Sequence, residues 1–285
     1  MPELPEVETI RKGLAARIVG LKITGGELHF PKAVIGDLGT VQGATITAVE
    51  RLGKLLIFKL DVPYVITIHL KMTGQLIWQS ANGEDPVMGG HPEKSYLEPH
   101  PHRHTRFSFA LSDGSQLFFN DLRKFGKIQI VPAAELAEVR FIKTLAPEPA
   151  SPEFTVDYLT QKLAKRTSPI KPLLLDQTII AGLGNIYADE SLFRAKILPL
   201  RPANSLSTEE LVALHAAIKE TLEIALKHGG SSSRDYVDAV GNKGTFLAVA
   251  TVYHRTGLPC VVCGSPIERI KLGGRSTHFC ANCQH

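Results

Sequence analysis

The pattern of apolar and polar positions changes character along the chain. Near the N-terminus, an apolar stripe at helical spacing runs through Val7, Ile10, Leu14 and Ile18. Pro5 before most of the stripe and Gly20 after it are typical helix boundaries, so a helix is predicted from about Pro5 to Val19. Later segments alternate or run apolar between turn residues, which predicts strands at 44–49, 55–60, 64–70, 106–111 and 116–119. We expect a short helix followed by an antiparallel β-sandwich or open barrel.

The pattern becomes helical after a proline-rich segment, LAPEPASPE at 145–153, whose composition is typical of a linker. The sequence Ser207-Thr-Glu-Glu210 is a capping box and Gly229-Gly230 is a stop, so a long helix is predicted over 208–228. A shorter helix around 155–165 and another that begins near Gly184-Asn185-Ile186 complete a helical module. The chain therefore predicts an α+β protein with more than one domain.

Composition agrees with a folded two-domain protein. The chain has 285 residues, of which 44% are hydrophobic, enough for a sizeable core and against wholesale disorder. No run approaches the roughly 20 apolar residues that a membrane-spanning helix needs, and the N-terminus has no apolar signal core. A soluble cytoplasmic protein without membrane contact is the expectation.

The net charge of +4 is too small to name a partner, but its distribution is uneven. Residues 230–285 hold six Lys and Arg against three acids, a net +3, which leaves +1 for the other 229 residues. All four cysteines lie in the same segment.

Those cysteines form two Cys-x-x-Cys pairs, Cys260/Cys263 and Cys280/Cys283, separated by sixteen residues. This spacing is typical of one four-thiolate zinc site, whereas a pair of disulfides is less consistent with a chain that lacks a secretory signal. Residues 267–272 between the pairs can form a strand, so a metal-pinned β-hairpin is expected, with most of its folding energy from the metal. Because all four ligands come from the protein, the zinc is structural, and the hairpin presents basic side chains, Arg275 first among them.

The N-terminus holds a candidate nucleophile. Removal of Met1 makes Pro2 the terminal residue, and α-amino groups titrate near 7.7–8.0, so part of its secondary amine is unprotonated at neutral pH. Attack on a sugar C1′ would give an iminium adduct, with one of the carboxyls of Glu3 and Glu6 as acid or base and the other positioning the terminus. The plain alternative is that Pro2 only precedes a helix.

A second stretch, DQTIIAGLGNIYADESLF at 176–193, is a candidate phosphate site. Gly182 and Gly184 permit a tight turn, and a helix that begins at Asn185 offers free N–H groups to an anion. Upstream, Lys165, Arg166 and Lys171 are placed to add phosphate contacts. An ordinary helix–helix corner and a solvated helix face would have the same composition.

A third stretch, NDLRKFG at 120–126, contains side chains suited to filling a gap in a base stack. Arg123 and Phe125 are separated by one residue near the end of a strand, and Met72 in HLKMTG is another candidate wedge. Each of the three alone also fits a core or surface position. The histidines at 91, 100, 102 and 104 suggest a second metal only weakly, and a loop that enters a strand is favoured.

These motifs together resemble bacterial formamidopyrimidine-DNA glycosylases, of the formamidopyrimidine-DNA glycosylase and endonuclease VIII family. The matching segments cover essentially the whole chain in the family's order: PELPEVET, the Lys54 region after Arg51, HLKMTG, NDLRKFG, LAPEP, GLGNIYADESLF and the terminal GGRSTHFCANC. The start resembles this enzyme more than endonuclease VIII, which usually begins PEGPE. Two positions depart from the family pattern, Leu122 in place of Pro in Asp-Pro-Arg and Ala146 in place of Gly in LGPEP.

The resemblance implies a bifunctional base-excision-repair DNA glycosylase and AP lyase. It would flip and remove oxidised purines such as 8-oxoguanine and formamidopyrimidines through a Schiff base at Pro2, and then cleave the strand by β,δ-elimination. By similarity, Glu3 is the general acid/base, Glu6 supports the site, Lys54 acts in β-elimination and Arg275 in δ-elimination. The DNA-contacting positions are implied to be His102, Arg123, Arg166, Lys171 and Asn185, with Met72, Arg123 and Phe125 as the trio that fills the space left by the lesion.

The resemblance also implies the organisation of the molecule and its partners. The expected parts are an N-terminal catalytic β-sandwich domain at 1–133, a linker at 134–153, a helix-two-turn-helix domain at 154–229, a lesion-covering loop region at 230–252 and a zinc finger at 253–285. The implied cofactor is one structural Zn²⁺. The implied partner is double-stranded DNA with oxidised purines or abasic sites, bound by a monomer in the bacterial cytoplasm at the nucleoid.

Two alternatives stay open on sequence. One is an endonuclease VIII-like preference for oxidised pyrimidines. The other is a damage-binding or architectural zinc protein without catalysis, for which a nucleophilic terminus has no use.

Overall fold

The computed structural model describes residues 2–82, 87–90, 98–231 and 244–285. The chain divides into two compact units, which are Met1–Lys143 with Gly229–Thr245, and Thr144–His228 with Phe246–His285. The segment after the long helix thus returns to the first unit before the chain enters the second again. In the described residues, no helix is long and apolar enough to cross a membrane.

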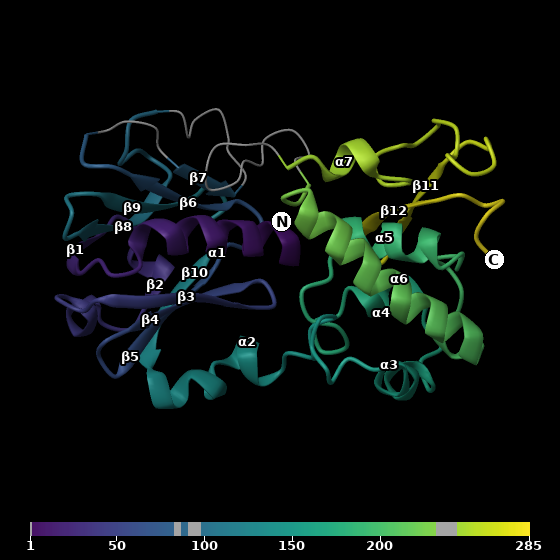
Figure 1. The fold of residues 1–285 in the computed structure, drawn as a ribbon, viewed down its shortest axis with the longest axis horizontal. Coiled ribbons are helices and arrows are strands. Elements are labelled where there is room, and N and C mark those ends of the chain that lie inside the picture. The colour runs from purple at the N-terminus through teal and green to yellow at the C-terminus, as the bar shows by residue number, and fades with distance from the viewer. Residues whose placement is uncertain (1, 83–86, 91–97, 232–243) are drawn as a thin grey trace. The chain divides into compact units, whose positions relative to one another are not determined.

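The first unit is a β-sandwich with one long helix (Figure 1). Its first sheet has the order β1-β8-β9-β6-β7, comprising Ile23–Leu28, Thr105–Leu111, Gln116–Asp121, Gly74–Gln79 and Val87–Gly90. The second has the order β2-β10-β5-β4-β3, comprising Val34–Ile35, Lys127–Pro132, Tyr64–His69, Leu55–Leu60 and Ile46–Leu52. All pairings are antiparallel except that of β2 with β10.

Helix α1 (Leu4–Ile18) closes the open side of this sandwich. It contacts β3 and β7, which are the edge strands of the two sheets. The predicted apolar stripe is buried and belongs to the same core as Phe58 of the second sheet and Phe119 of the first. Because the stripe faces the core, the first turn of α1 is held in place by the packing of the whole unit. Short turns of 3-10 helix at Pro31–Ala33, Leu38–Val41 and Ala133–Glu138, with α2 (Arg140–Lys143), complete the unit.

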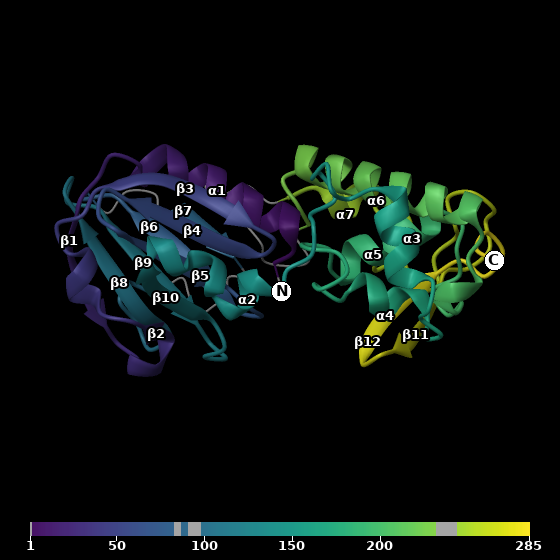
Figure 2. The ribbon, with the colours of Figure 1, turned by 90° about the horizontal axis from the view of Figure 1, so that it is seen from below.

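The second unit is helical and carries a small hairpin. Its helices are α3 (Val156–Leu163), α4 (Ile170–Leu174), α5 (Asn185–Arg194), α6 (Thr208–Lys227) and α7 (Phe246–Val249), with a 3-10 turn at Ala203–Ser205. Helix α5 contacts α4, α6 and the hairpin strand β12, so it is the centre of the unit. Strands β11 (Glu268–Leu272) and β12 (Arg275–Phe279) pair antiparallel and project from the helices (Figure 2).

The predicted fold class is confirmed, including the N-terminal helix, the antiparallel sandwich, the helical module and the hairpin with four cysteines. Helix α6 has the predicted capping box, in which the Ser207 N–H donates to Glu210 Oε2 at 2.8 Å. Strands β1, β2, β6, β7 and β10 lie outside the ranges that were predicted as strands of the sandwich. In β1, ITGGEL, two glycines interrupt the apolar alternation that marked the predicted strands.

Candidate active site and nucleic-acid interface

The candidate nucleophile lies at the start of α1, in the first unit. Pro2 is buried, and Glu3 and Glu6 are each 3% exposed. Glu6 Oε2 accepts a hydrogen bond from the Glu3 N–H at 2.9 Å, which anchors the residues just before the helix. The N-terminal end of the helix dipole favours carboxylates at this place. The structure therefore brings Pro2, Glu3 and Glu6 together, as the sequence predicted.

The second oxygen of Glu6 is committed to a distant part of the chain. Glu6 Oε1 accepts hydrogen bonds from the Ser231 N–H at 2.7 Å and the Ser231 hydroxyl at 2.9 Å. Gly230 is required beside it, because its φ is +84° and a Cβ there would lie 2.8 Å from Glu6 Oε1. Sequence reasoning used Gly230 only as a helix stop and missed Ser231, since nothing local connects residues 225 positions apart.

Lys54 lies in the turn between β3 and β4 and is 3% exposed. The turn is tied to α1 through Arg51, whose Nε donates to Glu8 Oε2 at 3.0 Å and whose Nη1 donates to the Gly53 carbonyl at 2.9 Å. Burial raises the pKa of Glu8, but its hydrogen bonds and charge interactions with Arg11 and Arg51 outweigh burial and bring the pKa below its usual value. Glu8 is thus a carboxylate that fixes the Lys54 turn to the helix that begins next to Pro2.

His69 at the end of β5 is a neutral neighbour of Lys54. Burial, followed by the charges of Lys71 and Lys54, lowers the pKa of His69 to about 3. The Lys71 N–H donates to His69 Nδ1 at 3.0 Å, which fixes the ring orientation. The motif HLKMTG was singled out on sequence for its methionine, and the proximity of this histidine to Lys54 was missed.

The three candidate wedge residues lie on two loops that are joined by hydrogen bonds. The buried carboxylate of Asp121 accepts from the Thr73 hydroxyl, the Arg123 N–H at 3.2 Å and the Gly126 N–H at 2.7 Å. The Arg123 N–H also donates to Thr73 Oγ1 at 3.1 Å. The loop that carries Met72 is therefore held against the loop that carries Arg123 and Phe125.

The side chains of this wedge are available for contact. Phe125 is 52% exposed, the Arg123 guanidinium lies 4.9 Å from the centre of its ring, and Met72 is half-buried. Leu122, which departs from the family pattern, is 39% exposed. An exposed aromatic ring beside an arginine is suited to stacking against bases.

His102, the predicted DNA contact on the loop before β8, is half-buried. Its N–H donates to Thr105 Oγ1 at 2.9 Å, and its Nδ1 accepts from the His104 N–H at 3.1 Å. Burial, followed by the charge of His104, lowers the pKa of His102. Within the described residues, the histidines form no metal-binding group, and His91 lies outside them.

In the second unit, the four cysteine sulfurs lie within 4.8 Å of one another, and none is in a disulfide. The Sγ–Sγ distances are 3.9 Å for Cys260/Cys283 and 3.5 Å for Cys263/Cys280. Four thiolates around a tetrahedral zinc at about 2.3 Å would lie about 3.8 Å apart, so the site fits one structural Zn²⁺. This confirms the predicted metal ligands as a group.

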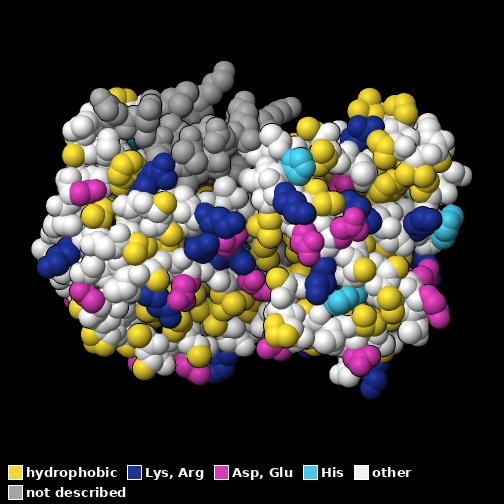
Figure 3. Space-filling view, viewed as in Figure 1, with side chains coloured by type: hydrophobic (Ala, Val, Ile, Leu, Met, Phe, Trp, Pro, Cys, Tyr) yellow, Lys and Arg dark blue, Asp and Glu magenta, His cyan; other side chains and the backbone are white. Residues whose placement is uncertain are grey.

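Three of the predicted phosphate contacts in this unit are placed to meet a ligand. Arg275 is exposed at the start of β12, and Arg166 is exposed between α3 and α4. Asn185 is the first residue of α5, and its Oδ1 has no hydrogen-bond partner in the described part of the chain. On the face drawn in Figure 3, Lys and Arg side chains are interspersed with Asp and Glu, so charge alone marks no single binding surface there.

Lys171 does not fit the phosphate contact predicted for it. Its side chain is 1% exposed, and Nζ lies 2.6 Å from Asp189 Oδ1, 2.7 Å from the Ser276 carbonyl and 2.9 Å from Thr277 Oγ1. A buried ammonium that makes two hydrogen bonds and an ion pair cannot reach a phosphate without breaking them. A buried lysine and a solvated one have the same appearance in sequence.

The lesion-covering loop region predicted at 230–252 is described only at its two ends. Residues 232–243 lie outside the described part, as does Met1, whose removal the nucleophile requires.

Comparison with known proteins covers nearly the whole chain. Three family models match it: a formamidopyrimidine-DNA glycosylase N-terminal domain at residues 1–128, a formamidopyrimidine-DNA glycosylase H2TH domain at 145–237 and a zinc finger found in FPG and IleRS at 257–285. A formamidopyrimidine-DNA glycosylase of Pelotomaculum thermopropionicum is 43% identical over 289 residues, which cover 100% of this chain and 99% of the relative. One of Nostoc sp. is 40% identical over 299 residues, which cover both chains completely.

Solved structures of similar proteins agree in fold. A point mutant of Lactococcus lactis FPG, in complex with a Fapy-dG containing DNA, has a TM-score of 0.87 at 38% identity, with 99% of each chain covered. The wild-type Lactococcus lactis protein in complex with an oxidized pyrimidine containing DNA has a TM-score of 0.86 at 38% identity, again with 99% of each chain covered. The MutM (FPG) protein of Thermus thermophilus has a TM-score of 0.86 at 39% identity, with 99% of this chain and 98% of that chain covered.

Proposed function

The chain belongs to the formamidopyrimidine-DNA glycosylase family, and from this membership we propose that it excises oxidised purines through a Schiff base at Pro2. It is a DNA-binding repair glycosylase with AP lyase activity and a structural zinc site, which excludes the alternative of a zinc protein without catalysis. The substrates we propose are 8-oxoguanine and formamidopyrimidines in duplex DNA. The Fapy-dG DNA bound by the Lactococcus lactis relative supports the second of these.

The chemistry begins with a base taken out of the stack, because C1′ cannot be attacked within a paired duplex. The lone pair of the Pro2 nitrogen forms a bond to C1′, and the electron pair of the C1′–N bond leaves with the damaged base. Glu3 transfers the proton that the leaving base or the opening sugar ring requires. The Pro2 nitrogen then loses its proton, and its electron pair forms a double bond to C1′ while the C1′–O4′ bond breaks and O4′ takes up a proton. The product is an iminium between Pro2 and C1′ of the opened sugar.

The iminium then acidifies the proton on C2′. Its removal breaks the C3′–O bond and releases the 3′ side of the strand, which is β-elimination, and a second elimination breaks the C5′–O bond. We assign Lys54 to the first elimination and Arg275 to the second. Glu6 touches neither bond in this scheme and holds the N-terminus through the Glu3 N–H.

The DNA is held by contacts to its backbone and by a plug in its stack. Arg166, Asn185 and Arg275 are assigned to phosphates, as is His102, and these contacts carry no sequence information. Met72, Arg123 and Phe125 occupy the space left by the everted base.

The enzyme acts as a monomer in this proposal. Light scattering of the DNA-bound protein tests this oligomeric state.

One observation carries the proposal, namely the buried Pro2–Glu3 terminus that Glu6 anchors. The test is borohydride trapping on an 8-oxoguanine duplex, followed by peptide mapping. We expect the reduced sugar to be covalently attached to the N-terminal peptide that begins at Pro2. Strand cleavage without an adduct at Pro2 would contradict the mechanism.

A variant separates the roles of the amine and the acid. Glu3→Gln keeps the Pro2 amine, so it should still be trapped on a duplex with a preformed abasic site. Its excision of 8-oxoguanine should fall by about 10²–10⁴-fold, the usual contribution of general acid–base catalysis. Equal losses on both substrates would contradict the assignment of Glu3 to base release.

A preference for oxidised pyrimidines is a second candidate, because a relative of 38% identity binds DNA that contains one. Excision rates on thymine glycol and 8-oxoguanine, in otherwise identical duplexes, separate the two.

A further inference from the structure

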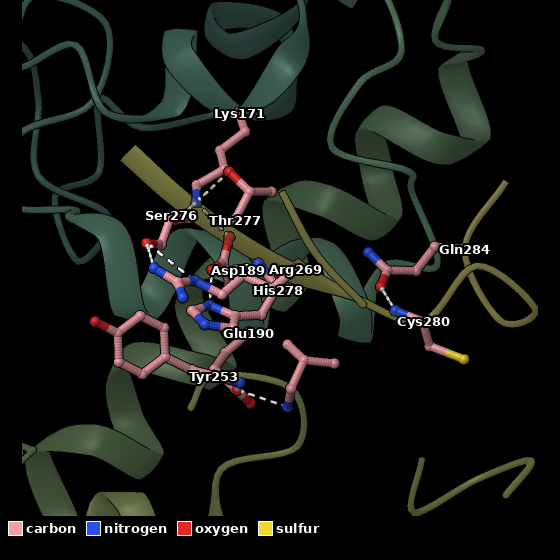
Figure 4. A network of polar contacts seen from close by, with 11 residues as sticks. Lys171, Asp189, Glu190, Tyr253, Arg269, Ser276, Thr277, His278, Cys280 and Gln284 are labelled. Carbon is pink, nitrogen blue, oxygen red and sulfur yellow. Dashed lines mark hydrogen bonds and ion pairs between the residues drawn. The ribbon is translucent and has the colours of Figure 1, made fainter. Parts of the chain in front are cut away.

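A buried polar network in the second unit joins α4, α5 and the zinc hairpin (Figure 4). Asp189 of α5 is fully buried and lies at its centre. Its Oδ1 pairs with Lys171 Nζ at 2.6 Å, and its Oδ2 accepts from the His278 N–H at 3.0 Å and from His278 Nδ1 at 3.1 Å. Asp189 therefore contacts α4 through one oxygen and β12 through the other.

The network holds β12 next to Arg275. Lys171 Nζ donates to the carbonyl of Ser276, the residue that follows Arg275, at 2.7 Å, and to Thr277 Oγ1 at 2.9 Å. On the other side of the hairpin, Arg269 Nη2 donates to the Ser276 hydroxyl at 2.8 Å. The backbone beside Arg275 is thus fixed by directional contacts, while the Arg275 side chain itself is exposed.

Helix α5 also carries Asn185, another residue that is assigned to phosphate binding. Asn185 and Asp189 are four residues apart in α5 and so lie on one face of the helix. The next residue, Glu190, accepts from the N–H groups of Thr251, Val252 and Tyr253 at 2.8–2.9 Å and holds the segment that leads into the zinc finger. One helix therefore sets the positions of Asn185 and of the hairpin that carries Arg275.

A buried ion pair pays a large desolvation penalty, so apolar packing of the same volume often stabilises a fold as well or better. Unlike apolar packing, ion pairs and hydrogen bonds constrain the relative orientation of the two elements. Lys171 Nζ donates two hydrogen bonds to β12 and forms an ion pair with Asp189 Oδ1, while Asp189 Oδ2 accepts from His278, so these contacts favour one register of the hairpin on the helices.

We propose that Asp189 is a positioning residue for Arg275, acting through Lys171 and His278 to hold the zinc hairpin at a fixed spacing from Asn185. Asp189 touches no DNA in this scheme, and its effect on phosphate binding and on the second elimination passes through Arg275. The inference rests on the role proposed above for Arg275.

The experiment is a double-mutant cycle between Asp189→Asn and Arg275→Ala in the full zinc-loaded chain. Two quantities are measured: the slope of log Kd against log salt for a duplex with a tetrahydrofuran abasic analogue, and the β,δ-elimination share of the products from an abasic-site duplex. Each single variant should reduce the steepness of the slope by about 0.9, the value for one phosphate contact, and lower the β,δ share. The double variant should match Arg275→Ala alone.

Three controls separate positioning from loss of structure. Glu220→Gln removes the exposed partner of Arg194, the last residue of α5, 2.9 Å away, and should leave both quantities unchanged. Zinc content and borohydride trapping at saturating DNA should be unchanged in Asp189→Asn. If that variant does not fold, Thr277→Val removes one acceptor of Lys171 and should shift both quantities in the same direction by a smaller amount.

Additive effects of the two substitutions would overturn the positioning role, as would wild-type values in a folded Asp189→Asn variant. If Arg275→Ala itself has wild-type values, the role proposed for Arg275 fails, and the inference fails with it. The cycle thus distinguishes an error in the network from an error in the proposed function.

Discussion

At the scale of single residues, the candidate active site depends on charged groups that do no chemistry themselves. Glu6 holds the Glu3 backbone with one oxygen and Ser231 with the other. Glu8 holds Arg51, which in turn holds the carbonyl of Gly53 beside Lys54. Both carboxylates belong to the first two turns of α1, so the helix aligns the proposed nucleophile and the proposed elimination lysine.

Arg51→Met tests this alignment. It removes the donor to Gly53 and keeps the aliphatic stem, so the Lys54 turn loses its tie to α1. We expect β-elimination on an abasic-site duplex to slow by about tenfold to a hundredfold, the cost of a small misplacement of a reacting group. Gel assays of single turnovers measure the rate. Lys59→Met, which removes the more exposed pair of Lys59 with Glu50 at 3.6 Å on the same hairpin, should leave the rate unchanged.

The lowered pKa of His69 predicts how the stability of the fold depends on pH. Its pKa of about 3 in the folded state lies below the ordinary value of 6.5, so the unfolded chain binds a proton at higher pH than the folded one. The contribution of His69 to stability is therefore full above pH 6.5 and falls as the pH drops toward 3, by at most about 1.4 kcal/mol per pH unit. By NMR, the His69 ring should show no titration between pH 8 and 5. A midpoint within that range would contradict the buried, neutral state.

At the scale of elements, the first unit places the turn at Gly230 directly against the carboxylate of Glu6. Gly230 and Gly257 both have a positive φ, +84° and +77°. A methyl group added at Gly230 would meet the Glu6 carboxylate, whereas one added at Gly257 would have no described neighbour within 4 Å. The pair therefore separates backbone strain from collision.

We expect Gly257→Ala to lower the free energy of unfolding by about 1–2 kcal/mol, because a residue with a Cβ is strained in the left-handed region. Gly230→Ala should cost more, because the methyl group would displace the Glu6 carboxylate from Ser231, and it should also slow base excision. Thermal unfolding and 8-oxoguanine excision are the measurements. Equal effects of the two substitutions on excision would contradict a role for the Glu6–Ser231 contact.

Elements with local signals were predicted well from the sequence. The boundaries of α6 follow from its capping box and terminal glycines, and those of β4 from an apolar run between two turns. The burial of Lys171 and the partnership of Glu6 with Ser231 had no local signal, because each depends on residues about 105 or 225 positions away. The motif resemblance placed the candidate residues, but only the packed structure separates those that face a ligand from those that hold others in place.

At the scale of the whole molecule, the two units have separate hydrophobic cores. One contains α1 and both sheets, and the other is built around α5 and α6. A third, small cluster joins Phe193 of α5 to Cys260 and Cys280, so the zinc finger adds little apolar burial of its own. The hairpin should therefore depend on its metal, whereas the sandwich should not.

Removal of zinc with a strong chelator is expected to act on one unit only. Without the metal, the four cysteine sulfurs have no common ligand that joins them, and the hairpin that carries Arg275 should lose its structure. DNA binding should weaken by at least about tenfold, and its salt dependence should become less steep as phosphate contacts are lost. Amide exchange should stay slow in β4, β5 and β8 and become fast in β11 and β12. Restored zinc should reverse the changes, and loss of protection in the sandwich strands would contradict the independence of the two cores.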